Sequence, residues 1–173
     1  GPLSGGVPAS GGSLSNLMAL VIARNIAGLE NDPKAVFMVS EDSHVSFSKA
    51  LRIMGLPQDS LVKIPTDEKG KLNMTNLSLT FKQFQLKKKK CFAIVATAGT
   101  TVRGAIDPLL ELAEFCKKEN IWLHVDGAIG GVFNLSSSTS SLLNGISLAN
   151  SITINPQKIL GIAKTSSILL VAN

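Results

Sequence analysis

Short apolar runs alternate with helical patterns along most of this chain, and that order restricts its possible folds more than any other feature. The runs are apolar almost throughout rather than at every second residue, as in strands buried on both faces of a parallel sheet. Segments with helical spacing of apolar residues separate them. We therefore predict an α/β fold with a mainly parallel sheet flanked by helices. The predicted strands are residues 35–39, 61–64, 92–97, 121–125 and 151–155, and the predicted helices are residues 14–22, 43–54, 73–85 and 108–119.

Composition excludes several kinds of protein. With 173 residues, 45% of them hydrophobic, the chain suits one compact domain. No apolar stretch is long enough to cross a bilayer. The net charge of +5 comes mostly from a lysine run at residues 87–90, which lacks the interleaved aromatic residues of a base-stacking surface. We expect that run to be a solvated helix end or loop, and we expect no nucleic-acid partner.

The cysteines and the two ends bear on the origin of the chain. Residues 1–4 resemble a scar of protease cleavage, and a strand-like run at residues 167–171 lies directly before the end, so we expect an incomplete piece of a larger enzyme. No charged and then apolar leader opens the sequence, and Cys91 and Cys116 have neither metal nor redox spacing. We therefore expect a cytoplasmic protein with reduced thiols and no bound metal.

A glycine-rich segment and a histidine are the first two candidates for chemistry. In residues 10–16, two glycines precede a helix whose N-terminal N–H groups and dipole suit an anion. The alternative is an ordinary glycine-rich turn with Ser13 as the helix N-cap. A lone histidine near a helix start is more often structural than catalytic, but His44 follows a predicted strand, which places it at the edge of the sheet where ligands bind.

Asp126 and Lys158 are the other two candidates. Asp126 closes an apolar strand, where an ionised carboxylate needs a partner: a metal, a loop to cap or a cationic ligand. The small residues after it, including Ala128, leave room for a flat group. Lys158 lies three residues beyond the last predicted strand in an apolar stretch, where an amine is a usable nucleophile, and the alternative is a surface lysine. Together, an anion cup, an imidazole, a carboxylate and a lysine are the parts that pyridoxal phosphate requires.

Six segments carry a resemblance to a known family. The chain resembles the group II pyridoxal-phosphate-dependent decarboxylases, a family that includes glutamate, cysteine-sulfinate and aromatic amino-acid decarboxylases, and it is most similar to the glutamate and cysteine-sulfinate branch. The resemblance runs from about residue 6 to the end. The segments are residues 10–16, 43–46, 96–101, 104–108 and 124–128, and Ser151-Ile152 with Lys158 after them.

The resemblance implies a role for each matching residue. Lys158 is the lysine that forms the Schiff base with the cofactor, and with His44 and Asp126 it makes up the catalytic set. Asp126 pairs with the pyridinium nitrogen, while His44 and Ala128 cover the two faces of the ring. The residues implied in cofactor binding are Ser13 and Leu14 through backbone N–H groups to the phosphate, His44, Thr97 near the ring, Asp126, Ala128, Asn155 at the phosphate, and Lys158.

The resemblance also implies an architecture and a reaction. The fold is the large domain of the fold-type I pyridoxal-phosphate enzymes, with a mostly parallel seven-stranded sheet, and the intact enzyme is a homodimer with the active site near the interface. Residues 1–173 are expected to be part of that domain, with the C-terminal small domain absent and this piece inactive alone. The expected reaction converts an L-amino acid, preferably an acidic one such as glutamate, aspartate or cysteine sulfinate, into its amine and CO2.

Two positions depart from the family pattern, and alternatives remain. Gln157 stands directly before the lysine, where the family usually has histidine, and Gly127 replaces a more usual alanine. Glutamine still donates a hydrogen bond but cannot transfer a proton near neutral pH. The alternatives are another fold-type I lyase or aminotransferase, and a non-catalytic module that has kept the cofactor fold.

Overall fold

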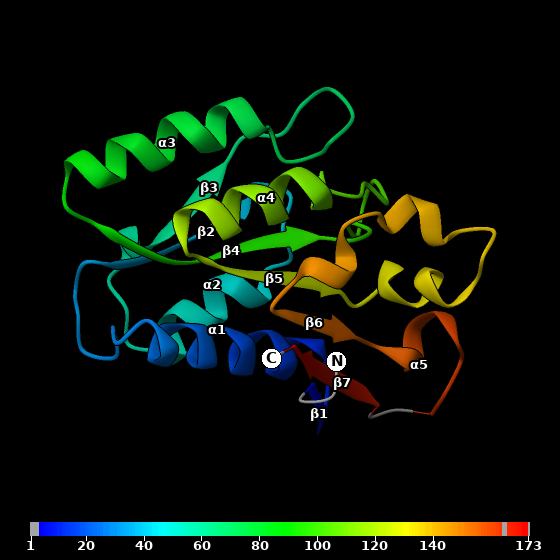
Figure 1. The fold of residues 1–173 in the computed structure, drawn as a ribbon. Coiled ribbons are helices and arrows are strands. Elements are labelled where there is room, and N and C mark those ends of the chain that lie inside the picture. The colour runs from blue at the N-terminus through cyan, green and yellow to red at the C-terminus, as the bar shows by residue number, and fades with distance from the viewer. Residues whose placement is uncertain (1–3, 164–165, 173) are drawn as a thin grey trace.

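The computed structural model describes residues 4–163 and 166–172, so most of the expected cleavage scar at residues 1–4 lies outside the described part. Within that part, seven strands form one sheet in the order β1-β7-β6-β5-β4-β2-β3 (Figure 1). The strands are β1 Gly5–Ala9, β2 Ala35–Ser40, β3 Leu61–Ile64, β4 Lys90–Thr97, β5 Trp122–Gly127, β6 Ser151–Ile154 and β7 Ser167–Val171. The α-helices are α1 Gly12–Ile26, α2 Ser46–Ile53, α3 Met74–Leu86, α4 Leu109–Glu119 and α5 Pro156–Ile159. Short 3-10 helices span Gln58–Ser60, Gly130–Leu135, Ser140–Leu143 and Ile146–Leu148.

The sheet is mainly parallel, which confirms the predicted fold class. Strands β6, β5, β4, β2 and β3 are parallel neighbours, whereas β7 is antiparallel to both β6 and β1. The sequence did not predict β1, because its two glycines and Pro8 lack any strand-like pattern. Proline is tolerated there because β1 is an edge strand with only one neighbour.

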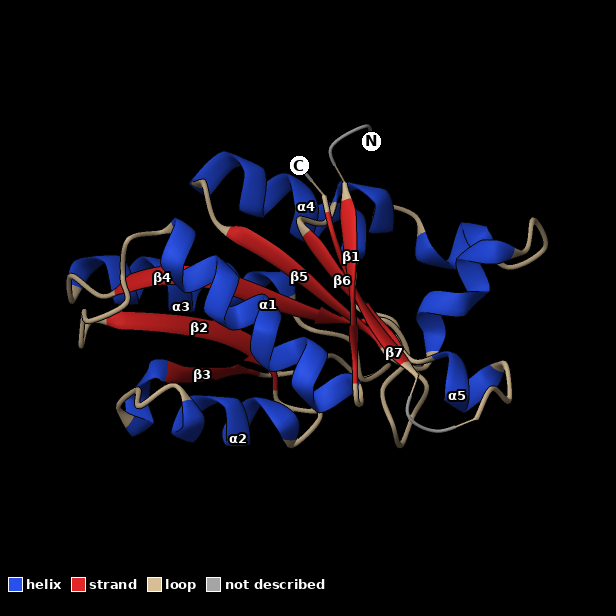
Figure 2. Cartoon of the chain, turned by 90° about the horizontal axis from the view of Figure 1, so that it is seen from below, coloured by secondary structure: helices blue, strands red, loops and turns tan. Residues whose placement is uncertain are grey.

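Helices cover both faces of the sheet. Figure 1 shows α3 and α4 on one face and α1 and α2 on the other, and Figure 2 looks from the side of α1 and α2. Strand β2 supplies both layers of the core because successive side chains point to opposite faces. Val36 and Met38 pack in the cluster that includes α3 and α4, while Phe37 and Val39 pack in the cluster with α1 and α2.

The topology brings the chemically interesting segments to one edge of the sheet. The carboxyl ends of β2, β4, β5 and β6 lie together because these strands are parallel. Strand β1 is antiparallel to β7, which is antiparallel to β6, so β1 also ends at that edge. Helix α1 therefore begins there, and the glycine-rich turn at residues 10–12 meets the segments that follow the parallel strands.

Two other sequence expectations concern surface properties. The lysine run begins at the end of α3 and enters β4, and two of its members are paired at 2.8 Å, Lys89 with Asp59 and Lys90 with Asp32. This is the helix-end position that the composition predicted. Among the described helices, none has the length and apolar character needed to span a membrane.

Candidate functional site

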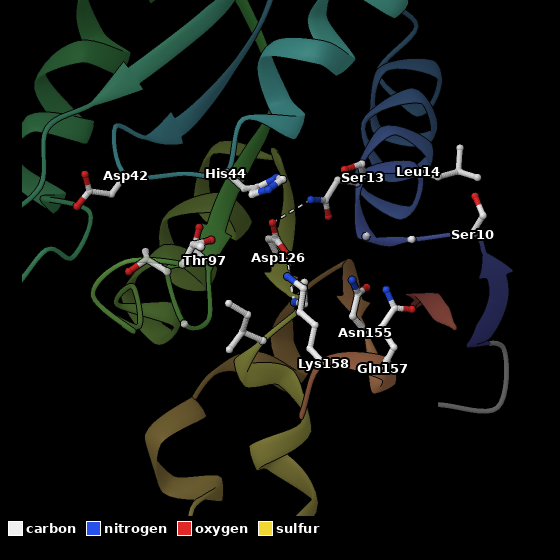
Figure 3. A pocket seen from close by; sticks show the side chains of 18 residues that line it. Ser10, Ser13, Leu14, Asp42, His44, Thr97, Asp126, Asn155, Gln157 and Lys158 are labelled. Atoms are coloured by element: carbon white, nitrogen blue, oxygen red, sulfur yellow. Dashed lines mark hydrogen bonds between the residues drawn. The ribbon is translucent and has the colours of Figure 1, made fainter. Parts of the chain in front are cut away.

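A pocket of about 430 Å³ opens at the carboxyl edge of the sheet, between the start of α1 and the segments after β2, β4, β5 and β6 (Figure 3). All eight predicted site residues line it, together with Gln157. They come from five separate segments, so the topology assembles the site. The eight are Ser13, Leu14, His44, Thr97, Asp126, Ala128, Asn155 and Lys158.

One end of the pocket is built around the start of α1. The N-cap is Gly11 rather than Ser13, because the helix begins at Gly12, two residues earlier than the N-cap alternative required. The N–H groups of Leu14 and Ser15 both donate to the Gly11 carbonyl, at 3.0 and 3.2 Å. Since the Leu14 N–H already has a partner, we regard the N–H of Ser13 as the better donor for an anion at this helix start.

Two amide side chains present donors to the same end. Ser167 Oγ donates to Asn155 Oδ1 at 2.6 Å, and the Ser166 N–H donates to Gln157 Oε1 at 2.8 Å. Because these contacts occupy the two amide oxygens, the amide nitrogens are the groups left to face the pocket. Donors without acceptors beside a helix N-terminus form a site for an anion such as phosphate.

Gly12 is required by the close approach of Asn155. A Cβ atom at position 12 would lie 2.9 Å from Asn155 Nδ2. We expect Gly12→Ala to displace this amide, which Ser167 holds in place, and to weaken pyridoxal phosphate binding by about 10-fold, as for the loss of one hydrogen bond to a charged group. Titration of the intact protein with the cofactor measures this. Gly5→Ala is the matched control because a Cβ there meets nothing within 4 Å; equal affinities in the two variants would contradict the prediction.

The middle of the pocket is a slot beside a buried carboxylate. Asp126 is 5% exposed and accepts from the Ala128 N–H at 3.2 Å and from Asn16 Nδ2 at 2.9 Å. His44 lies across the slot in Figure 3, and its Nδ1 accepts from the Ser46 N–H at 3.1 Å. The slot therefore offers an imidazole and a small alanine side chain beside one negative charge, which suits a flat cationic ring.

Thr97 has a buried hydroxyl that no protein group satisfies. Its Oγ1 has no hydrogen-bond partner, although the residue is 5% exposed and lines the pocket. Asp107 fixes the backbone here, accepting from the N–H groups of Thr97 and Leu72 at 2.7 Å each. Burial raises the pKa of Asp107 to about 6 despite these two donors. A buried hydroxyl without a partner usually indicates a ligand or water contact.

Lys158 lies on α5, a single turn that the sequence did not predict. Figure 3 shows its side chain extending into the pocket toward Asp126, while its backbone N–H donates to the Asn155 carbonyl at 3.0 Å. The apolar residues that follow it are not buried, since Ile159 and Leu160 are each about half exposed. The lysine is thus positioned by the turn itself and not by an apolar enclosure.

Three residues in the same region had no predicted role. Asn16, Asp107 and His124 lay inside the motifs that carried the family resemblance, but nothing in the sequence indicated what they contact. Asn16 gave one available signal, because it is a polar residue on the face of α1 that also carries Leu20 and Ala23 in the core. A buried polar residue on an apolar helix face requires a hydrogen-bond partner from another element.

His124 is fully buried on β5, and burial lowers its pKa from 6.5 to about 4. The folded protein therefore stays neutral at this site while the unfolded chain takes up a proton, so stability is lost as the pH falls from about 6.5 to about 4. We expect this residue to reduce the free energy of unfolding by about 3 kcal/mol over that range. Denaturant unfolding of the intact protein and of His124→Gln at several pH values measures the difference.

The comparison with His124→Gln is needed because Asp107 acts in the opposite direction. Its pKa is raised from 3.8 to about 6, so its contribution to stability grows as the pH falls through about the same range. Both proteins contain Asp107, and subtracting one stability curve from the other removes its effect. Identical pH dependence in the two proteins would show that His124 does not titrate as its burial requires.

The residues present fit pyridoxal phosphate. The anion end offers amide and helix donors, the slot offers a carboxylate and an unsatisfied hydroxyl, and Lys158 offers an amine. Within the described ranges, no three His, Cys, Asp or Glu side chains are grouped as a metal site requires.

Comparison with known proteins gives a consistent result. The profile of the family described as "Pyridoxal-dependent decarboxylase conserved domain" matches residues 2–173. An aromatic-L-amino-acid decarboxylase of Bacillus atrophaeus is 42% identical over 154 residues, which are 88% of this chain and 32% of that protein. A glutamate decarboxylase-like protein of Gibberella zeae is 36% identical over 177 aligned residues, covering 99% of this chain and 34% of that protein. The chain thus spans about a third of the length of the curated relatives it matches.

Solved structures share the fold. The glutamate decarboxylase domain of diaminobutyrate-pyruvate transaminase and L-2,4-diaminobutyrate decarboxylase from Vibrio parahaemolyticus has a TM-score of 0.92 and 32% identity. The match covers 97% of this chain and 39% of that chain. This likeness confirms the fold-type I architecture that the sequence resemblance implied.

Proposed function

The chain belongs to the pyridoxal-dependent decarboxylase family, and from this premise we propose that the intact protein releases the α-carboxylate of an L-amino acid as CO2 with the help of pyridoxal phosphate. The observation that carries the proposal is the pocket that joins an anion site, a buried carboxylate and a lysine at one sheet edge. We further propose that residues 1–173 are part of the large domain, and that the small domain belongs to segments outside this chain.

The lining residues divide the work of holding the cofactor. The Ser13 N–H and the amide nitrogens of Asn155 and Gln157 would bind the phosphate. Asp126 would keep a proton on the ring nitrogen, and Lys158 would hold the cofactor covalently through Nζ. When bound, pyridoxal phosphate supplies a ring that accepts the electron pair left behind by the departing carboxylate.

The other side chains would orient the reacting groups. His44 and Ala128 would cover the two ring faces and exclude water from them. The Thr97 hydroxyl, which lacks a protein partner, would donate near the ring. Lys158 would return to its covalent position when the amine product leaves, its amine being displaced by that of the substrate at the start of each turnover.

Gln157 cannot act as a general acid or base in this site. Its oxygen is held by the Ser166 N–H, and an amide does not transfer protons near neutral pH. We therefore assign Gln157 to phosphate binding. The group that protonates the substrate carbon after CO2 leaves is therefore not Gln157.

Two substrate classes are supported by different observations. The motifs shared with the glutamate and cysteine-sulfinate branch favour an acidic amino acid such as glutamate, aspartate or cysteine sulfinate. The 42% identity to an aromatic-L-amino-acid decarboxylase favours an aromatic amino acid as the second candidate. We propose the acidic class first, because the sequence motifs span the whole pocket.

A substrate panel separates these possibilities. We expect the intact protein, supplied with pyridoxal phosphate, to release CO2 and amine in equal amounts from one class of L-amino acid. Acidic, aromatic and diamino acids should each be tested, with both products measured. Formation of a keto acid instead would identify an aminotransferase, and cofactor binding without turnover of any amino acid would identify a non-catalytic module.

We also propose a cytoplasmic homodimer, as the family resemblance implies. Cys91 and Cys116 are free thiols, in keeping with a reducing compartment. Light scattering of the intact protein measures its mass and tests the dimer directly.

A further inference from the structure

A row of buried polar side chains leads from Asp126 into the interior of the domain. Asn16 contacts Asp126, His124 contacts Asn16, Ser151 contacts His124 and Trp122 contacts Ser151. We propose that this row is a one-way hydrogen-bond chain in which Asn16 and His124 position Asp126 against the cofactor ring. The inference rests on the proposed function only where it concerns the cofactor, since the direction of the chain is a property of the protein alone.

The inner end of the chain allows one consistent direction. The indole N–H of Trp122 can only donate, and it lies 2.8 Å from Ser151 Oγ. The Ser151 hydroxyl accepts this bond, so its own proton is available for His124 Nδ1 at 2.8 Å. His124 Nδ1 can therefore accept from Ser151 when the proton of the neutral imidazole lies on Nε2, and because a hydroxyl oxygen can accept two bonds, the outer end decides between the two tautomers.

The outer end fixes the direction. An ionised carboxylate only accepts, so Asn16 must present Nδ2 to Asp126 Oδ2 at 2.9 Å. The Asn16 oxygen then faces His124 Nε2 at 3.0 Å and accepts its proton. The outer end therefore selects the histidine tautomer, the inner end accommodates it, and burial, which lowers the pKa of His124, keeps its ring neutral. A charged ring would carry a proton on Nδ1 and force the Ser151 hydroxyl to turn away.

Because the chain is buried, the direction of its hydrogen bonds affects the orientation of the Asp126 carboxylate. Asn16, His124 and Ser151 are each at most 1% exposed, so a reversed bond has no water to replace it. With the Ala128 N–H on its other oxygen, Asp126 has a protein donor on each side, which fixes the plane of the carboxylate (Figure 3). Were Asn16 turned round, its oxygen would face Asp126 and repel it. The state of a histidine with no pocket contact thus determines how the carboxylate meets the ring.

Histidine spectroscopy tests the chain without any cofactor. In the intact apo protein labelled with 15N-histidine, the His124 signals are assigned by their loss in His124→Gln. We expect a neutral ring protonated on Nε2 alone at neutral pH, and a change in the Nδ1 signal in Ser151→Ala. A proton on Nδ1, or a charged ring, would overturn the proposal. The tautomer itself is read in the unsubstituted protein, and the His124→Gln variant serves only to assign the signals.

A matched pair of serines tests the effect on the cofactor. Ser151 and Ser60 are equally buried, but the Ser60 hydroxyl has no partner and lies outside the chain. We expect Ser151→Ala to weaken pyridoxal phosphate binding by about 10-fold, Ser151→Thr to restore it, and Ser60→Ala to stay within about 2-fold of the original protein. The 15N shift of ring-labelled cofactor should move toward the unprotonated value in Ser151→Ala alone.

The outcomes separate the two proposals. Equal affinities and ring shifts in Ser151→Ala and Ser60→Ala would overturn the positioning role while leaving the proposed function intact. Failure of the unsubstituted protein to bind pyridoxal phosphate would overturn the proposed function, and the histidine spectra would then decide the direction of the chain alone.

Discussion

Replacing Lys158 with alanine in the intact protein is expected to abolish covalent attachment of the cofactor and to lower kcat by at least about 1,000-fold. Among the described residues that line the pocket, Lys158 has the only amine, so no neighbour replaces it. Borohydride reduction followed by peptide mass analysis measures attachment directly. The unsubstituted protein should retain one reduced cofactor on the peptide that contains Lys158, and the variant should retain none.

Two further variants make this test specific. Lys158→Arg keeps the positive charge but lacks an amine that can bond to the cofactor, so it should fail as completely as the alanine variant. Lys117→Ala removes a lysine near the end of α4, the helix that leads into the amino end of β5 and therefore away from the pocket, and it should attach cofactor normally. A reduced cofactor on Lys158→Ala would show that another lysine carries it.

The sequence predicted the sheet well wherever burial controls the pattern. Strands β2, β4 and β5 are covered on both faces, so they are apolar along most of their length. They can therefore be recognised in the sequence without knowing how the helices are arranged. Strand β1 is different, because Gly5, Gly6 and Pro8 have no preference for extended structure. It becomes a strand by pairing with β7, whose partner residues lie more than a hundred positions away, and local pattern contains no information about that contact.

The site was predictable at the level of residue type and place, but not at the level of contacts. Asp126 and Lys158 were found because a charged group at a strand end is conspicuous. The bond from Asn16 to Asp126 joins residues 110 positions apart, and only the fold shows that α1 crosses the end of β5. The proton position on His124 depends in turn on Asn16, which lies 108 positions away, so no short segment could have indicated it.

The exposure of α5 shows a second limit of pattern reading. Ile159, Leu160 and Ile162 suggested an apolar enclosure for Lys158, yet each is about half exposed in the described structure. The prediction that these apolar residues enclose Lys158 was therefore wrong. In the proposed intact enzyme, these exposed residues are available for contact with segments outside this chain. The light-scattering and binding experiments therefore use the intact protein.

Substituting Asp126 by asparagine is expected to lower kcat by about 100-fold to 1,000-fold while covalent attachment to Lys158 persists. Asparagine has the same shape and can still accept from Asn16 through its one oxygen, so the change removes the negative charge together with the bond accepted from the Ala128 N–H. Without that charge the ring nitrogen loses its proton, and the ring becomes a poorer acceptor of the electron pair that the carboxylate leaves. The measurements are kcat on the preferred amino acid and the reduced-cofactor mass used for Lys158.

Asp107→Asn is the matched control, because Asp107 is another buried carboxylate at the same edge but serves two backbone N–H groups rather than the pocket. Its loss should lower the melting temperature and reduce kcat far less than Asp126→Asn does. Asp126→Glu should be intermediate, since it keeps the charge but adds a methylene to a buried side chain that is held by a donor on each oxygen. If Asp107→Asn lost more kcat than Asp126→Asn, the catalytic charge would belong to Asp107 and not to Asp126. The hydrogen-bond chain through Asn16 and His124 would then have no catalytic carboxylate to position.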